Sequence, residues 1–227
     1  MSNSVPEAVA GVAETMAAYP GRWVLCGGWA VDAWLDRETR DHGDIDVSVF
    51  LDESQILYEY LADWELVGHD AFTDDTNELW NGRLLTLPAH LHGRIARPGE
   101  EIPREGPLLA DRGFGVEFVL NERTADDEWV LYFTPPDGKA SAHEPVVTIT
   151  FDRGVQESRF GVPTLAPEAV LFYKATAYKD TRHYLRQRDH IDFERLVPRL
   201  NGEQRGWLSD AIARVEPDHP WLGVLAM

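Results

Sequence analysis

A short apolar segment that runs into two glycines is the sequence feature that most constrains this fold. Residues 23–26 have the length and composition of a buried strand, and Gly27-Gly28 interrupts them before an apolar segment, residues 29–35, with helical spacing. Glycines at a strand–helix junction let a ligand approach the backbone, and the unpaired amides of a helix N-terminus favour an anion such as a phosphate. A plain tight turn would need the same glycines, so the junction alone leaves both interpretations open.

An Asp-Ile-Asp sequence on the next predicted strand gives this junction a chemical context. Ile45, Val47 and Val49 alternate with polar residues, which predicts a strand whose apolar side chains enter the core. Asp44 and Asp46 then project together from the other face. A solvated strand edge would explain the pair alone. Two neighbouring carboxylates repel each other unless a cation lies between them, however, and Mg²⁺ commonly bridges carboxylates to substrate phosphates. With the glycines, the pair is typical of metal-assisted chemistry on a nucleoside triphosphate.

The remaining pattern predicts a mixed α/β part followed by helices. Further helices are predicted over residues 5–16, 54–64, 167–184, 189–199 and 202–215, and further strands over 116–120, 129–133 and 146–151. Residues 65–112 are rich in Gly, Pro and acidic residues and predict no clear element. We therefore expect a mixed β-sheet flanked by helices over residues 1–160, and a helical part over 161–227 that closes one side of the cleft.

Charge and composition exclude several classes of partner. The chain has 227 residues with 21 Lys+Arg against 39 Asp+Glu, a formal net charge of −18. This charge disfavours DNA, RNA and anionic membranes, and it allows a cationic small molecule or a divalent metal. Cys26 is the single cysteine, so neither an intrachain disulfide nor a thiolate zinc site can be built from the chain. Because no signal peptide or apolar run of roughly 20 residues is evident, we expect a cytoplasmic protein. The sequence does not fix the oligomeric state.

The order of these residues resembles a known enzyme superfamily. The glycine pair followed by Asp-hydrophobic-Asp on the next strand is similar to the nucleotidyltransferase superfamily that includes DNA polymerase β. The detailed pattern is closest to the aminoglycoside and lincosamide nucleotidyltransferases. The matching residues are Gly27, Gly28, Trp29, Ala30, Arg37, Thr39, Arg40, His42, Asp44 and Asp46. The resemblance implies a nucleotidyltransferase fold of the α/β (α+β) class, with Mg²⁺ and a nucleoside triphosphate, ATP by default, as cofactor and co-substrate.

That superfamily normally supplies a third carboxylate from a neighbouring strand. On the strand predicted over 116–120, the period of two places Glu117 on the face opposite to Val116 and Phe118. A charge between apolar neighbours is costly without a partner, so we choose Glu117, with Glu122 as the alternative. Many members carry Asp here, so the longer Glu117 leaves open whether this residue is a metal ligand, the base, or both.

The resemblance also implies roles for the remaining site residues. Asp44 and Asp46, with Glu117, would hold Mg²⁺ and carry catalysis. The backbone of Gly27 and Gly28 would bind the triphosphate. Further nucleotide-binding residues are expected to be Arg40, His42 and Lys174. Each has an ordinary structural alternative: an ion pair with a nearby Asp for Arg40, a structural hydrogen bond for His42, and a solvated side chain for Lys174. Asp189 and Asp192 need no function, because acids are favoured near a helix N-terminus.

The acceptor is expected to be a small molecule, cationic like an aminoglycoside, and to receive AMP on a hydroxyl with release of pyrophosphate. A candidate wall for such a cation, or else a solvated loop, is formed by Asp70, Asp74, Asp75 and Glu78. Two alternatives stay open. The chain could nucleotidylate a protein partner, as toxin–antitoxin relatives do, or it could be a non-catalytic nucleotide-binding module.

Overall fold

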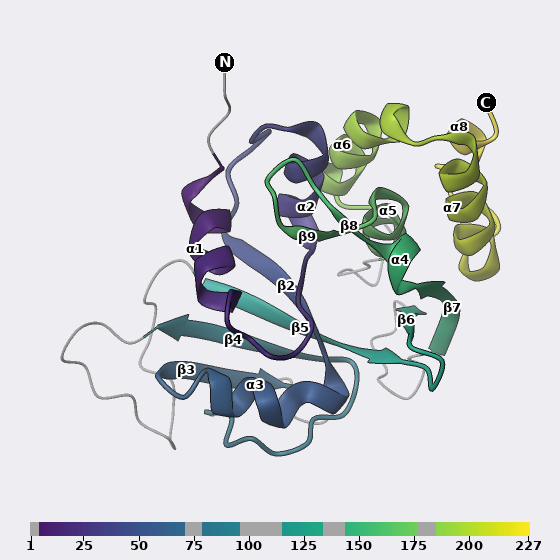
Figure 1. The fold of residues 1–227 in the computed structure, drawn as a ribbon. Helices are drawn as coiled ribbons and strands as arrows, with labels where there is room; N and C mark the ends of the chain where they lie inside the picture. The colour runs from purple at the N-terminus through teal and green to yellow at the C-terminus, as the bar shows by residue number, and fades with distance from the viewer. Residues whose placement is uncertain (1–4, 71–78, 96–114, 134–143, 177–184) are drawn as a thin grey trace.

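The computed structural model describes residues 5–70, 79–95, 115–133, 144–176 and 185–227, and the structural statements below concern those residues (Figure 1). The N-terminal elements are α1 (Glu7–Met16), β1 (Val24–Leu25), α2 (Gly27–Leu35), β2 (Asp44–Phe50), η1 (Leu51–Glu53) and α3 (Ser54–Tyr60). The central elements are β3 (Trp64–His69), β4 (Ala89–Ile95), β5 (Gly115–Arg123), β6 (Glu128–Phe133), β7 (Glu144–Thr150), α4 (Phe151–Gly154), β8 (Val155–Glu157) and β9 (Pro163–Leu165). The C-terminal helices are α5 (Pro167–Thr176), α6 (Gln187–Leu196), η3 (Val197–Arg199), α7 (Gly202–Val215) and α8 (Leu222–Leu225).

A mixed β-sheet organises the described chain, as the sequence predicts. Its main path runs β3-β4-β5-β2-β1-β9-β8, and β6 pairs with both β5 and β7. Strands β2 and β5 are parallel neighbours, and so are β1 and β9, whereas the other pairs are antiparallel. The central pair β2–β5 is the one that bears the predicted carboxylates.

The alternation along β2 and β5 gives the sheet two different faces. Ile45 and Val47 of β2, with Phe118 of β5, are fully buried in a core shared with α1 and α3. The polar residues of both strands point to the opposite face, where a second core unites α2 with the C-terminal helices. Helices α5 to α8 gather on one side of the molecule, where α5 and α6 pack against α2 (Figure 1). The face of the sheet that bears the polar residues of β2 and β5 is therefore the face on the side of these helices.

The helical part begins directly after a strand of the same sheet. Thr164 of β9 pairs with Leu25 of β1, so residues 163–165 extend the sheet before α5 starts at Pro167. Pro167 suits this position, because the first turn of a helix leaves its N–H groups unpaired. None of the described helices has both the length and the apolar character needed to cross a membrane. The division into a mixed α/β part over residues 1–160 and a helical part over residues 161–227 stays a prediction.

The element predictions fail mainly between residues 54 and 95. The predicted helix 54–64 ends at Tyr60, because Trp64 already starts β3 and packs edge-on against Phe118. Strands β3 and β4 were not predicted, because Gly68 and Gly93 interrupt their apolar pattern. Close packing explains both glycines: a Cβ on Gly68 would lie 3.2 Å from Trp80, and one on Gly93 3.0 Å from Phe118. Of the helix predicted over 167–184, the structure describes α5 to Thr176, and residues 177–184 lie outside the described residues.

Candidate active site

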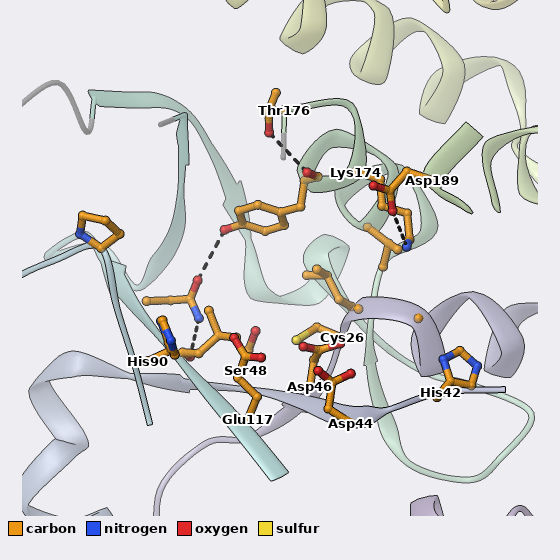
Figure 2. A pocket seen from close by; sticks show the side chains of 18 of the residues that line it. Cys26, His42, Asp44, Asp46, Ser48, His90, Glu117, Lys174, Thr176 and Asp189 are labelled. Atoms are coloured by element: carbon orange, nitrogen blue, oxygen red, sulfur yellow. Dashed lines mark hydrogen bonds and ion pairs between the residues drawn. The ribbon is translucent and has the colours of Figure 1, made fainter. Parts of the chain in front are cut away.

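Three acidic side chains meet at the centre of the sheet on the polar face. Asp46 of β2 lies directly beside Glu117 of β5 in the parallel register, and Asp44 is two residues before Asp46 on the same face. Each of the three offers a carboxylate oxygen, and these oxygens lie within 4.8 Å of one another (Figure 2). The register of β2 against β5 therefore brings together the three residues chosen from the sequence as metal ligands.

The alternative third carboxylate is in a different environment. Glu122 lies five residues further along β5, where its carboxylate accepts a hydrogen bond from the Tyr132 hydroxyl of β6. It belongs to no potential metal-ligand group among the described residues. The geometry thus favours Glu117 over Glu122 as the partner of Asp44 and Asp46.

Asp46 has a raised pKa in this environment. Burial, and after it the nearby charges of Glu117 and Asp44, raise the pKa of this residue from 3.8 to about 6. Lys174 and a backbone hydrogen bond from Gly28 act against the rise. A group of acids that disfavours its own ionisation is stabilised by a bound cation.

Gly27 is required where strand β1 turns into helix α2. It adopts φ +61°, in the left-handed region, and a Cβ at this position would lie 1.7 Å from Asp46 Oδ2. The backbone can approach the carboxylate this closely only without a side chain. The group that approaches the Gly27 backbone in the structure is Asp46 of β2, and the approach of a ligand to the glycine pair stays a prediction.

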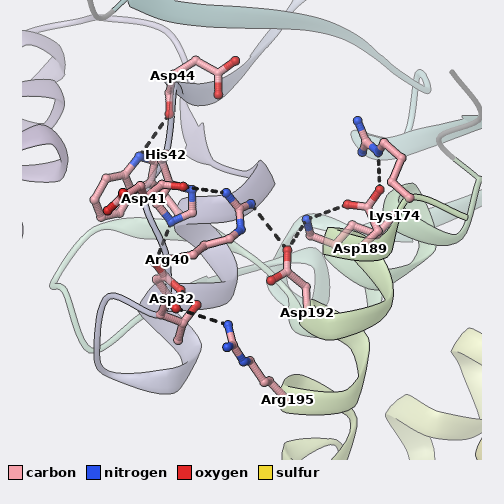
Figure 3. A network of polar contacts seen from close by, with 12 residues as sticks. Asp32, Arg40, Asp41, His42, Asp44, Lys174, Asp189, Asp192 and Arg195 are labelled. Carbon is pink, nitrogen blue, oxygen red and sulfur yellow. Dashed lines mark hydrogen bonds and ion pairs between the residues drawn. The ribbon is translucent and has the colours of Figure 1, made fainter.

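Asp32 of α2 fixes the loop that precedes β2. This fully buried carboxylate accepts hydrogen bonds from Thr39 Oγ1 at 2.5 Å and interacts with His42 Nε2 at 2.6 Å. His42 also packs against Trp29 with tilted rings 4.3 Å apart, and the Trp29 indole N–H donates to the Asp44 carbonyl at 3.1 Å. These contacts explain the spacing of Thr39, His42 and Asp44 (Figure 3). They also favour a structural role for His42, which holds the loop through its contact with Asp32. That His42 binds a nucleotide stays a prediction.

The same loop directs Arg40 toward the polar face. Its Nη2 lies 3.5 Å from Asp192 Oδ2 of α6, and its Nη1 donates to the Asp41 carbonyl at 3.1 Å. Its Nε is buried and has no hydrogen-bond partner in the described part of the chain. A Cβ on Gly28 would meet Arg40 Nη2 at 2.4 Å, so the guanidinium lies against the N-terminus of α2. The ion pair expected as the structural alternative is present, and a donor remains for an anion.

Lys174 of α5 is buried in a cluster of charges rather than solvated. Its Nζ lies 3.2 Å from Asp189 Oδ1 and 2.8 Å from Asp192 Oδ2, and both acids are 1% exposed. Arg186 donates to Asp189 from the start of α6 (Figure 3). The solvated alternative for Lys174 is wrong. The two acids, for which the helix dipole was a sufficient explanation, also pair with Lys174. Burial makes them the counter-ions that hold Lys174 and Arg40 in place.

A cavity of about 420 Å³ connects these groups. It lies between the polar face of the sheet and helices α5 and α6 (Figure 2). Its lining includes every site residue chosen from the sequence, namely Gly27, Gly28, Arg40, His42, Asp44, Asp46, Glu117 and Lys174.

Several lining residues were missed by sequence reasoning. Tyr173 and Asn121 form a hydrogen-bonded wall, in which the Tyr173 hydroxyl donates to Asn121 Oδ1 at 3.3 Å. His90 and Tyr132 also line the cavity. Of these, Asn121 had a usable signal, because it shares the predicted face of Glu117. The others depend on packing between elements distant in sequence.

Of the four acidic residues expected as a wall for a cation, the structure describes only Asp70. Asp70 is 4% exposed and forms an ion pair with Arg83 at 2.7 Å, and it does not line the cavity. Asp74, Asp75 and Glu78 lie outside the described residues. Arg37 is exposed in the loop before β2 and does not line the cavity either.

Gly27→Ala is expected to destabilise the protein and to disturb the carboxylate group. A left-handed conformation costs a residue with a Cβ about 1–2 kcal/mol, and contact with Asp46 adds to this cost. Urea unfolding should therefore show a loss of about 2 kcal/mol or more. The matched control is Gly11→Ala on the exposed side of α1, where a Cβ meets nothing within 4 Å and should stabilise by about 0.5–1 kcal/mol. Equal stabilities of Gly27→Ala and wild type would contradict the assigned geometry.

Comparison with known proteins supports the resemblance seen in the sequence. Residues 8–74 match the model of the aminoglycoside-2''-adenylyltransferase family, and this segment contains the glycine pair and both aspartates of β2. No curated protein sequence matches the chain significantly.

Solved structures of two antibiotic adenylyltransferases have a similar fold. Lincomycin-bound LnuA, a lincosamide antibiotic adenylyltransferase, matches with TM-score 0.51 and 16% identity over 86% of this chain and 98% of its own. ANT(2'')-Ia in complex with adenylyl-2''-tobramycin matches with TM-score 0.51 and 14% identity over 90% of this chain and 94% of its own. The solution structure of the antibiotic-resistance factor ANT(2'')-Ia gives TM-score 0.50 and 14% identity, with coverage of 95% and 93%. The chain therefore has the nucleotidyltransferase fold of the lincosamide and aminoglycoside adenylyltransferases, and its residues 8–74 carry the sequence pattern of the aminoglycoside-2''-adenylyltransferase family.

Proposed function

We propose that this protein transfers a nucleoside monophosphate, AMP from ATP, to a hydroxyl of a small cationic acceptor of the aminoglycoside or lincosamide type, and releases pyrophosphate. The observation that carries this proposal is the group formed by Asp44, Asp46 and Glu117 against the glycine turn at the start of α2. The family match over residues 8–74 supports the same reaction class.

The carboxylate group fits Mg²⁺. It offers only hard oxygen donors from three side chains. Burial and the charges of Glu117 and Asp44 raise the pKa of Asp46, and a bound cation would offset both effects. Asp44 and Asp46, with Glu117, would hold one or two ions. Bound Mg²⁺ supplies charge neutralisation at the phosphates and orients the leaving group.

The surrounding residues supply positive charge and hydrogen-bond donors for the triphosphate. Arg40 offers its buried Nε, and Lys174 faces the cavity from α5. The N-terminus of α2 at Gly27 and Gly28 adds backbone amides and the positive end of the helix dipole. All of these groups lie on the helical side of the cavity, which supports binding of the triphosphate between α2 and α5.

The transfer step would proceed by in-line attack of the acceptor hydroxyl on the α-phosphorus. The new bond joins the acceptor oxygen to the α-phosphorus, and the bond from the α-phosphorus to the β-phosphate oxygen breaks. We infer that Glu117 completes the metal site or takes the hydroxyl proton, because its carboxylate lies in one group with those of Asp44 and Asp46. The pyrophosphate leaves with the electron pair of the broken bond.

The charge of the protein favours a cationic acceptor and disfavours nucleic acid. A net charge of −18 and the cavity carboxylates of Asp44, Asp46 and Glu117 attract a polyamine-like sugar and repel a polynucleotide. We further propose that residues 1–160 form the catalytic part and that the helices of 161–227 close the cavity, since α5 and α6 provide Tyr173, Lys174 and Asp189 to its lining.

The test is pyrophosphate release with Mg²⁺ and each of the four ribonucleoside triphosphates, across a panel of aminoglycosides and lincosamides. We expect release that depends on ATP and on one acceptor class. Silence with Mg²⁺-dependent nucleotide binding would exclude the tested antibiotics and favour an untested small acceptor or a protein partner. Silence without nucleotide binding would favour a fold that has lost its catalytic function, and it would overturn the proposal.

A further inference from the structure

Three histidines from strands β3 and β4 lie on the same face of the sheet as the carboxylate group. His69 pairs with His90 across β3 and β4, and His92 is two residues further along β4. Across β4 and β5, His90 pairs with Val119 and His92 pairs with Glu117. Paired residues of antiparallel strands project from the same face, so the histidines lie beside Glu117 on the cavity side.

The three imidazoles form a nearly equilateral triangle. The ring centroids of His69 and His90 are 5.0 Å apart, those of His69 and His92 are 5.2 Å apart, and those of His90 and His92 are 5.0 Å apart. Each ring offers a nitrogen, and these nitrogens lie within 4.8 Å of one another. Tetrahedral zinc with Zn–N bonds of about 2.0–2.1 Å holds its nitrogens about 3.4 Å apart. Small rotations of the exposed or half-buried rings would close this difference.

We propose that His69, His90 and His92 bind one divalent transition-metal ion, with Zn²⁺ as the natural occupant, at a site separate from the Mg²⁺ carboxylates. Three imidazole nitrogens are a ligand set for Zn²⁺, Ni²⁺ or Cu²⁺, whereas Mg²⁺ prefers carboxylate and water oxygens. Three protein ligands leave one tetrahedral position for water or substrate.

The position of the site couples it to the cavity. His90 lines the cavity and lies near Glu117 in Figure 2, and His92 is exposed, so an ion can enter from solvent. Glu117 of β5 has Asp46 as its neighbour on β2 and His92 as its neighbour on β4. The negative charge of this face adds attraction for a second cation. The proposed ion would therefore lie at the edge of the cavity, beside the carboxylate group.

Co²⁺ is the best probe, because its visible absorption reports a tetrahedral nitrogen environment that Zn²⁺ cannot show directly. Full-length protein without a histidine tag would be stripped with chelator and titrated with Co²⁺ in the presence of excess Mg²⁺. We expect one Co²⁺ per chain, displaced by Zn²⁺ with loss of the absorption. His92→Gln and His69→Gln should each weaken binding more than about a hundredfold, since loss of an outer-shell partner alone costs about 10–100-fold.

Two control variants make the outcome decisive. His190→Gln removes a half-exposed histidine on α6 and should leave Co²⁺ binding unchanged. Asp46→Asn should also leave the Co²⁺ spectrum unchanged, because the proposed ligands exclude the carboxylates. Loss of the spectrum in Asp46→Asn but not in His92→Gln would place the ion in the carboxylate group and overturn the proposal. Absence of a Co²⁺ spectrum in wild type would overturn it too. Both of these outcomes concern Co²⁺ binding alone. The proposed function is tested independently, by pyrophosphate release with Mg²⁺.

Discussion

Asp46→Asn is expected to remove nucleotidyl transfer while leaving a folded protein. A metal ion that neutralises phosphate charge contributes several kcal/mol to transition-state stabilisation. Losing about 4 kcal/mol lowers the rate about a thousandfold at 1.36 kcal/mol per factor of ten. Asn keeps the size of Asp and can still accept the Gly28 hydrogen bond, so the turn at α2 should persist. Pyrophosphate release measured with saturating Mg²⁺ and ATP checks the rate.

The same substitution should stabilise the metal-free protein above pH 6. The folded pKa of Asp46 is raised to about 6 from 3.8, chiefly by burial. The stabilising contribution of this group is therefore fully present below pH 3.8 and is lost as the pH rises through about 6. The neutral amide avoids that loss, so Asp46→Asn should melt at a higher temperature than wild type at pH 8 without Mg²⁺. Mg²⁺ should raise the Tm of wild type and leave that of the variant unchanged.

The matched control is Asp210→Asn, which removes one acidic charge from an exposed position on α7. It should retain wild-type transfer and the response of Tm to Mg²⁺. Undiminished transfer by Asp46→Asn would refute the assignment of the metal ligands, even if the fold and the family match are correct.

Lys174→Met is expected to give the largest loss of stability among single substitutions in the cavity wall. Met has a similar shape, but it leaves Asp189 and Asp192 buried with less counter-charge. Removing one partner of a buried ion pair costs about 3–5 kcal/mol, and we expect about 3 kcal/mol because Arg186 and Arg40 remain as partners. Urea unfolding at pH 7 measures this change, and transfer should fall as well because Lys174 lies in the field of Asp46.

A second substitution distinguishes charge burial from a general packing defect. Adding Asp189→Asn to Lys174→Met removes one of the stranded charges and should recover part of the lost stability, but not the activity. Arg199→Met, at an exposed position of η3, should change stability by no more than about 0.5 kcal/mol. If the double variant were less stable than Lys174→Met, the unpaired buried charge of Asp189 would not be the cause of the lost stability.

The sequence predicted the site best where the relevant pattern is local. Gly27 and Gly28 at a strand–helix junction and Asp44 and Asp46 at a spacing of two depend on backbone geometry within one or two elements. Glu117 could be predicted in the same way. The period of two along a strand shows which face a residue occupies, and the neighbouring strands need not be known.

The sequence predicted poorly the roles of residues whose contacts are with elements distant along the chain. Asp189 and Asp192 looked like ordinary acids near a helix N-terminus, and only the packing of α6 against α5 and the loop before β2 makes them buried counter-ions. Asp32 showed a weak signal as an acid within an apolar helix, but its partners became known only from the folded loop.

The sequence by itself determined the fold class, the glycine turn and the carboxylate pair, because strand and helix periods act over a few residues. The tertiary structure alone decided that Asp46 and Glu117 are neighbours in register, that Lys174 is buried in a charge cluster, and that the three histidines of β3 and β4 converge beside them. Strand order and register are set by the free energy of the whole packed sheet, and a single chain segment does not contain that information.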